Sequence, residues 1–298
     1  MARVRHGIVI LPQTDWPAAA RRWRQAEEYG FDHAWTYDHL SWRGLADERW
    51  HATIPTLTAA ATVTSRIGLG LFVASPNFRH PVPFAKELAT VDDIAGGRLL
   101  VGVGSGGTGF DAEVLGQPPL TPRERHARFV EFVDGLDALL RFEHPGSGGI
   151  SFSGDWYTAH DARMVGAPAH EPRAPLLIAG NGPKAIKYAA TRGDGWITTG
   201  GPEEDREAWW AGLAVLARRF DDEFAASGRE CEFSRVVLLD NDFGYSLASA
   251  ASYEDAVGRA ASLGFTDVVA HWPRDEGLYA GSESVLDEIG RASCRERV

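Results

Sequence analysis

The sequence predicts an α/β protein that folds as a (β/α)8 barrel, and three observations support this. Eight short apolar segments alternate with helical patterns, as in a parallel sheet built from strand–helix units. The chain has 298 residues, a usual size for such a barrel with insertions. Irregular insertions at 104–120 and 142–173 follow strand or helix ends, where barrels carry functional loops. A doubly wound open sheet is the alternative, because periodicity does not reveal closure.

The first four strands are short apolar runs that alternate with helical patterns. Asp15 is suited to cap the first helix, and Pro17 fits its first turn, where a missing N–H costs nothing. Gly30 ends this helix. We expect strands at 6–11, 33–37, 67–73 and 98–103, and helices at about 16–29, 54–64 and 82–94.

The middle of the chain departs from the regular alternation. A glycine-rich loop, 104–109, precedes a helix that opens with a capping box formed by Thr121 and Glu124. That helix has apolar residues at helical spacing up to Leu140. The segments 150–153 and 156–158 flank a Gly-Asp pair and predict a small hairpin.

The second half resumes the strand–helix pattern. We expect a helix capped by Ser252 and Asp255 that ends at Gly264. The remaining expected elements are strands at 175–179, 195–199, 233–239 and 266–270, and helices at 184–192, 203–226 and 283–289. We assign 1–290 to a single barrel domain and exclude 291–298, a charged segment without apolar periodicity, as a disordered or non-native tail.

Composition narrows the function classes. With 44% apolar residues the chain can bury a large core, and its net charge of −11 argues against a general nucleic-acid surface. Two cysteines are too few for a disulfide framework or a zinc cluster. Because the sequence also lacks a His-Glu-x-x-His motif and a close carboxylate–histidine repeat on one helix face, we expect no metal site. No segment resembles a signal peptide or a membrane span, so we expect a cytoplasmic protein without membrane contact.

Two stretches carry candidate chemistry. Asp38 and His39 follow the second strand and form a candidate acid–base pair, since imidazole titrates near neutral pH. The alternative is a histidine bonded to a loop backbone. The segment 180–183, Gly-Asn-Gly-Pro, joins a strand to a helix and leaves backbone N–H groups that could hold an anion. The alternative there is an ordinary turn. The segment 102–107 matches G-x-G-x-x-G only formally, because no helix is predicted directly after it.

Several stretches together resemble the bacterial luciferase-like superfamily of flavin- and deazaflavin-dependent oxidoreductases. Their order and spacing, from about residue 5 to residue 289, carry the resemblance. The segments are GFDHAWTYDHL (30–40), RIGLGLFVASPNFRHP (66–81), GGRLLVGVGSG (96–106), GDWYT (154–158), LIAGNGPKAIKYAATRGDGWITT (177–199) and GFTDVVAHWPR (264–274).

This resemblance implies a barrel and a cofactor site on its loops. The cofactor phosphate would lie on backbone N–H groups of the 180–182 turn, and the ring near the ends of the second, third and fourth strands. The peptide bond between Phe72 and Val73 would be cis. The implied cofactor-binding residues are Phe72, Val73, Ser105, Gly106, Ala179, Gly180, Asn181, Gly182, Pro183 and Lys184.

The resemblance favours hydride transfer with coenzyme F420. His39 would transfer a proton or contact the ring, and Asp38 would set orientation and polarity. The substrate pocket of a small molecule would include Trp42, Phe78 and Trp272. Sugar-phosphate dehydrogenases of this group carry a glutamate where this chain has Gly107, which argues against the same reaction.

Two other functions stay open. One is an FMN-dependent monooxygenase that uses reduced FMN from a partner reductase and oxygen. The other is a non-catalytic barrel that only binds flavin. A reductase that supplies reduced cofactor is a candidate partner, and we expect a homodimer.

Overall fold

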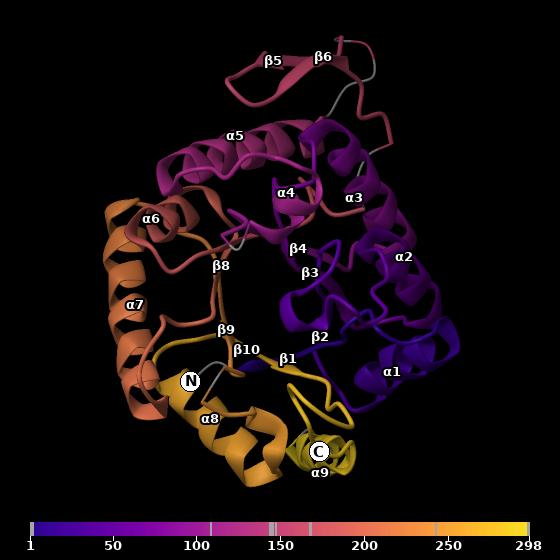
Figure 1. Cartoon of the computed structure of the whole chain (residues 1–298), viewed down its shortest axis with the longest axis vertical. Coiled ribbons are helices and arrows are strands. Elements are labelled where there is room, and N and C mark those ends of the chain that lie inside the picture. Colours follow the sequence, from indigo (N-terminus) through magenta and orange to yellow (C-terminus); the bar gives the residue numbers. More distant parts are fainter. Residues whose placement is uncertain are drawn as a thin grey trace. The chain divides into compact units, whose positions relative to one another are not determined.

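The computed structural model describes residues 3–107, 109–142, 146, 148–166, 169–241 and 243–296, without side chains from 291 onward. Eight parallel strands close into a barrel in the order β1-β10-β9-β8-β7-β4-β3-β2 (Figure 1). The predicted fold class is therefore confirmed, and the open sheet is excluded.

The elements follow the predicted alternation closely, and each barrel strand begins and ends within two residues of its expected bounds. The barrel strands are β1 Arg5–Val9, β2 His33–Thr36, β3 Gly68–Ala74, β4 Leu99–Gly104, β7 Leu176–Ala179, β8 Gly195–Thr198, β9 Ser234–Leu238 and β10 Asp267–His271. The helices are α1 Trp16–Glu28, α2 Thr53–Val63, α3 Pro81–Ala95, α4 Phe110–Val114, α5 Pro122–Leu140, α6 Pro183–Arg192, α7 Arg206–Ala226, α8 Ala250–Ser262 and α9 Ser284–Glu296. Two 3-10 helices, η1 Arg43–Leu45 and η2 Ser246–Ala248, and the antiparallel hairpin of β5 Ile150–Ser153 and β6 Thr158–Ala162 complete the set.

The chain divides into two compact units, which we describe separately. Unit 1 contains residues 1–11, 16–35 and 176–298, and unit 2 contains 12–15 and 36–175. The assignment of 1–290 to one domain stays a prediction. So does the tail: backbone up to Glu296 belongs to α9, while residues 297 and 298 lie outside the described residues.

Unit 1 packs its helices against the outside of its strands. The indole of Trp196 in β8 is fully buried and lies flat against Phe220 of α7, with ring centroids 5.0 Å apart. Figure 1 shows α6, α7 and α8 along the outer side of these strands. The residues of β8 that alternate with Trp196 therefore face the other way, toward the barrel interior.

Unit 2 is built around β3, β4 and the helices α2, α3 and α5. The capping box of Thr121 and Glu124 opens α5 as predicted, and Phe132 of this helix stacks on Phe84 of α3. Glu131 of α5 accepts N–H bonds from 155 to 157 and so holds the predicted hairpin against the helix. The hairpin lies beyond α5 in Figure 1.

One local prediction was wrong, and one short helix was missed. Ser249 caps α8 by accepting from the Ser252 N–H, so Ser252 lies inside the helix, and Asp255 does too. The short helix α4 was not predicted at all, because five residues are too few to show helical periodicity. It begins after Gly109, whose positive φ of 70° suits glycine.

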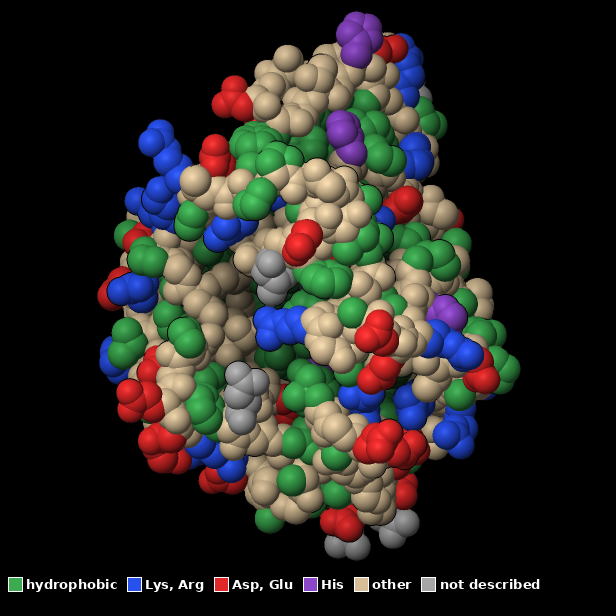
Figure 2. Space-filling view, viewed as in Figure 1, with side chains coloured by type: hydrophobic (Ala, Val, Ile, Leu, Met, Phe, Trp, Pro, Cys, Tyr) green, Lys and Arg blue, Asp and Glu red, His purple; other side chains and the backbone are tan. Residues whose placement is uncertain are grey.

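The surface is mixed in charge. On the face in Figure 2, basic and acidic side chains of the described residues are interspersed. In the part of the chain that the structure describes, no helix combines the length and apolarity that a membrane crossing requires.

Candidate functional site

The central feature of unit 2 is a histidine–carboxylate pair. His39, just after β2, has its Nδ1 2.7 Å from Oδ2 of Asp111 in α4. The other carboxylate oxygen of Asp111 accepts the Leu40 N–H at 2.7 Å. The Asp111 side chain has no exposed surface, whereas His39 is 12% exposed. An acceptor on Nδ1 fixes the ring and leaves Nε2 as the nitrogen that can exchange a proton.

Asp38 does not pair with its neighbour. Its carboxylate, 1% exposed, takes two hydrogen bonds from the guanidinium of Arg79, which also bonds Glu87. The expected Asp38–His39 pair is therefore wrong, because successive side chains in extended backbone point to opposite sides. Asp38 and Arg79 neutralise each other, and His39 obtains its carboxylate from Asp111.

Aromatic side chains surround His39. The Trp42 ring lies 4.4 Å from the imidazole centroid, and Tyr37 meets Trp42 edge-on at 5.2 Å. The Trp50 indole donates to the His39 carbonyl, which fixes the backbone at this residue. Phe72 stacks on Tyr37 with ring centroids 6.4 Å apart. The predicted pocket residue Trp42 is thus beside the imidazole, and the guanidinium of the exposed Arg43 lies 4.5 Å from the Trp42 ring.

The ends of β3 and β4 carry the other predicted residues of unit 2. The Phe72–Val73 peptide bond is cis, as predicted. Ser105 and Gly106 are half-buried in the loop after β4. Phe78 is half-buried too, and the Arg79 guanidinium lies 4.8 Å from its ring. Phe78 therefore contacts the arginine that forms the ion pair with Asp38.

Unit 1 holds the predicted phosphate turn. The Asn181 side chain bonds Thr198 and the Gly200 carbonyl, and the Gly180 carbonyl accepts from the Trp196 indole. Gly182 occupies the N-cap position of α6 without a side-chain cap, and nothing lies within 4 Å of where its Cβ would be. The turn is therefore rigid, while open space adjoins its last residue.

The side chains of this turn differ in exposure. Ala179 is half-buried, and Pro183 and Lys184 are exposed in the first turn of α6. A Cβ on Gly180 would stand 2.5 Å from that of Ala185, so this position excludes larger residues. The predicted set 179–184 is continuous in space, with its backbone N–H groups at the start of α6.

Trp272 does not fit its predicted role. The ring is 3% exposed, its N–H donates to Glu283, and it packs near Tyr29, the residue that follows α1. These contacts therefore join the segments that follow α1 and precede α9, and they give no support for a place in a substrate pocket.

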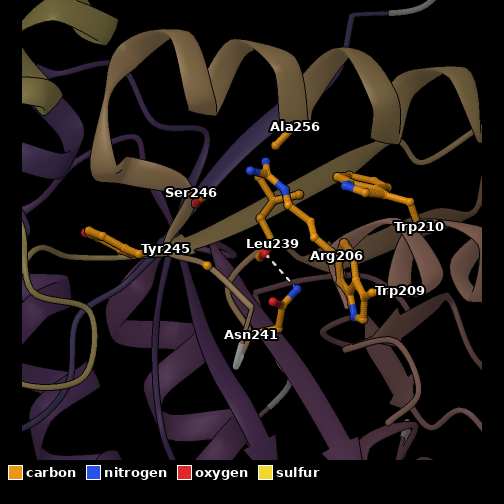
Figure 3. A pocket seen from close by; sticks show the side chains of 9 residues that line it. Arg206, Trp209, Trp210, Leu239, Asn241, Tyr245, Ser246 and Ala256 are labelled. Atoms are coloured by element: carbon orange, nitrogen blue, oxygen red, sulfur yellow. Dashed lines mark hydrogen bonds between the residues drawn. The ribbon is translucent and has the colours of Figure 1, made fainter. Parts of the chain in front are cut away.

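Two other polar features of unit 1 were not assigned from the sequence. Asp240, after β9, accepts from the backbone and Nδ1 of His271 and from the backbone and hydroxyl of Ser246. A small pocket beside it is lined by residues of α7, α8 and the loop after β9, among them Arg206 and Trp210 (Figure 3). It shares no residue with the turn at 179–184.

Among the residues that the structure describes, no group of three or more His, Cys, Asp or Glu side chains could hold a metal ion. The residue that sequence reasoning missed is Asp111. A carboxylate shortly after the glycine-rich loop was the available signal, but its helix is too short to detect.

The family model described as luciferase-like monooxygenase matches residues 2–270. An F420-dependent glucose-6-phosphate dehydrogenase of Beutenbergia cavernae is 38% identical over 59% of this chain and 50% of its own length. The corresponding protein of Kineococcus radiotolerans is 36% identical over 74% of this chain and 62% of its own. The chain thus spans about half to three fifths of these relatives. An F420-dependent hydroxymycolic acid dehydrogenase of Mycobacterium tuberculosis is 30% identical over 88% of this chain and 74% of its own length.

Solved structures share the fold. An F420-dependent tetrahydromethanopterin reductase of Methanopyrus kandleri has a TM-score of 0.77 at 19% identity and covers 97% of this chain and 98% of its own. An F420-dependent secondary alcohol dehydrogenase has a TM-score of 0.76 at 19% identity, over 90% of this chain and 93% of its own. The closed barrel, the match of the family model over residues 2–270 and the relatives all indicate the same family. The chain therefore belongs to the luciferase-like monooxygenase family.

Proposed function

We propose that this chain is an F420-dependent oxidoreductase that transfers a hydride between the cofactor and a small alcohol or carbonyl compound. The observation that carries the proposal is the His39–Asp111 pair, a reachable imidazole whose Nδ1 is held by a fully buried carboxylate. The relatives with 30–38% identity to this chain are F420-dependent dehydrogenases, which supports this cofactor over FMN.

The residues of unit 1 fit an anionic cofactor tail. The uncapped start of α6 offers backbone N–H groups, and the helix dipole favours negative charge there. Open space adjoins Gly182, and the bonds of Asn181 hold the turn in place. We assign the phosphate-bearing part of F420 to this turn, with Lys184 as a nearby cation.

The residues of unit 2 fit the acid–base part of the reaction. When bound, F420 accepts or donates a hydride at C5 of its ring. Loss of a hydride from an alcohol carbon requires loss of the hydroxyl proton, and His39 Nε2 is the group we assign to receive it. Asp111 keeps Nδ1 protonated and stabilises the imidazolium that forms. In the opposite direction the same Nε2 returns the proton to a carbonyl oxygen.

The surroundings of His39 favour a neutral, partly apolar substrate. Trp42 and Tyr37 present aromatic surface beside the imidazole, and the Arg79 charge is already matched by Asp38 and Glu87. A phosphorylated sugar would gain no unpaired cation from this ion-paired group. This agrees with the absence of a glutamate at Gly107, where sugar-phosphate dehydrogenases carry one.

A turnover assay tests this function. The purified chain is mixed with oxidised F420 and, in separate samples, neutral secondary alcohols and glucose 6-phosphate, and the loss of F420 absorbance is followed. We expect reduction with alcohols and none with glucose 6-phosphate. His39→Gln should lower the rate about a hundredfold or more. An unaffected rate in that variant would remove His39 from the reaction.

Partners and location follow from this proposal. We infer a small-molecule substrate, a homodimer and a cytoplasmic location. Light scattering during size-exclusion chromatography tests the dimer, and a mass of one chain would contradict it. Oxygen uptake with reduced FMN and a reductase would instead favour the monooxygenase alternative.

A further inference from the structure

Unit 2 contains a buried arginine without an anionic partner. Arg128 of α5 is 7% exposed, and among the described residues it forms no ion pair. Its guanidinium donates to the amide oxygens of Asn77 and Gln117, and its Nε has no acceptor. A buried charge is usually paired with an opposite charge, because transfer out of water is costly. In this chain, neutral amide oxygens solvate the buried guanidinium in place of a carboxylate.

The second hydrogen bond of the Asn77 side chain explains why an amide, and not a carboxylate, faces Arg128. Its oxygen accepts from Arg128, while its nitrogen donates to the Gly106 carbonyl at 3.1 Å. Arginine offers only donors and a carbonyl only accepts. An amide serves both partners at once, whereas a carboxylate would satisfy Arg128 and repel the Gly106 oxygen.

The loop after β4 depends directly on this amide. Gly106 has a φ of +68°, and a Cβ there would stand 2.4 Å from the Asn77 Nδ2. The loop backbone therefore packs flat on the amide, with no room for a side chain. Gln117 adds a second bridge, since it accepts from Arg128 and donates to the Asn77 carbonyl at 2.9 Å.

We propose that Asn77 and Arg128 are positioning residues that fix the 104–107 loop for cofactor binding, at the expense of an ion pair that aspartate at 77 would form. The part that concerns the cofactor rests on the proposed function, which assigns Ser105 and Gly106 to the ring. The fixing of the loop rests only on the hydrogen bonds of unit 2. Neither residue touches the reacting atoms in this account.

Asn77→Asp separates these two effects because it keeps the size of the side chain. The new carboxylate pairs with Arg128, so the melting temperature should equal or exceed that of the wild type. The loop loses its donor, so amide hydrogen exchange at 104–107 should accelerate about tenfold, as expected for one lost hydrogen bond. The dissociation constant of F420 should rise about tenfold for the same reason.

Asn241→Asp is the matched control in unit 1. Its side-chain oxygen, which accepts the Phe243 N–H, is kept in the aspartate. Exchange at 104–107 and F420 affinity should stay within twofold of the wild type. The control separates the loss of the bond to Gly106 from a mere change of net charge.

Each step of the proposal has a result of these experiments that contradicts it. A lower melting temperature, or failure to fold, contradicts the pairing of the new carboxylate with Arg128. Unchanged exchange at 104–107 contradicts the fixing of the loop. Faster exchange with unchanged F420 affinity contradicts the link to cofactor binding. If the wild-type chain binds no F420, the proposed function fails, while melting and exchange still test the positioning pair.

Discussion

Asp111→Asn tests the assignment of His39 most sharply. The asparagine oxygen can still accept the Leu40 N–H, which now reaches Asp111 at 2.7 Å. Its NH2 group then faces His39 Nδ1, where a carboxylate oxygen now lies at 2.7 Å. An imidazole that accepts at Nδ1 carries its proton on Nε2, so Nε2 cannot take a proton from the substrate. We expect kcat to fall about 10²- to 10⁴-fold, the usual contribution of general acid–base catalysis.

The assay is alcohol-dependent reduction of F420 under saturating cofactor. KM should change by less than about threefold, because Asp111 has no exposed surface and cannot contact the substrate. Loss of a charge-assisted hydrogen bond should lower the free energy of unfolding by about 1.5–3 kcal/mol, measured with urea. Glu113→Gln, an exposed change on the same helix, is the control. Wild-type kcat in Asp111→Asn would refute the role of the pair.

Three further predictions concern stability and the phosphate turn. Burial alone would raise the pKa of Asp267, but the His33 hydrogen bond and charge, with a nearby arginine, outweigh it and lower the pKa. Ionised Asp267 therefore stabilises the fold fully above its pKa in the unfolded chain, about 4. The stabilisation is lost as the pH falls through the lower pKa that Asp267 has in the folded protein. Asp267→Asn should cost about 3 kcal/mol at pH 7 in urea denaturation and less below pH 4, and a constant difference would contradict this. Arg79→Met should cost about 3–5 kcal/mol by the same measurement, since it leaves the buried Asp38 carboxylate unpaired, and a cost below about 1 kcal/mol would disprove the pairing. Gly182→Val should leave the melting temperature unchanged, because its φ of −78° and open surroundings admit a side chain, yet weaken F420 binding about tenfold in titration; intact binding would remove the turn from the site.

The fold could be predicted from the sequence because each strand–helix repeat of the barrel is formed by residues that are close in the chain. An apolar run such as 195–199 and a helix capped by Thr121 and Glu124 carry their own signals. The closure of the sheet into a barrel has no such local signal, since strand order depends on pairings between distant segments. Closure was predicted from the number of strand–helix repeats and from the family resemblance.

The site was only partly readable, because its bonds connect distant residues. His39 lies 72 positions from Asp111, and Asn77 lies 51 from Arg128. The sequence placed His39 correctly at a strand end but offered Asp38 as the nearest partner. Sequence order could not show that Asp38 points to Arg79, since side-chain direction depends on the local backbone.

A titration of the purified, cofactor-free chain with F420 and with FMN, followed by tryptophan fluorescence, tests the central claim directly. We expect saturable binding of F420 in the micromolar range or tighter and at least tenfold weaker binding of FMN. Tighter binding of FMN, or no binding of F420, would contradict the assignment of this chain to F420-dependent hydride transfer.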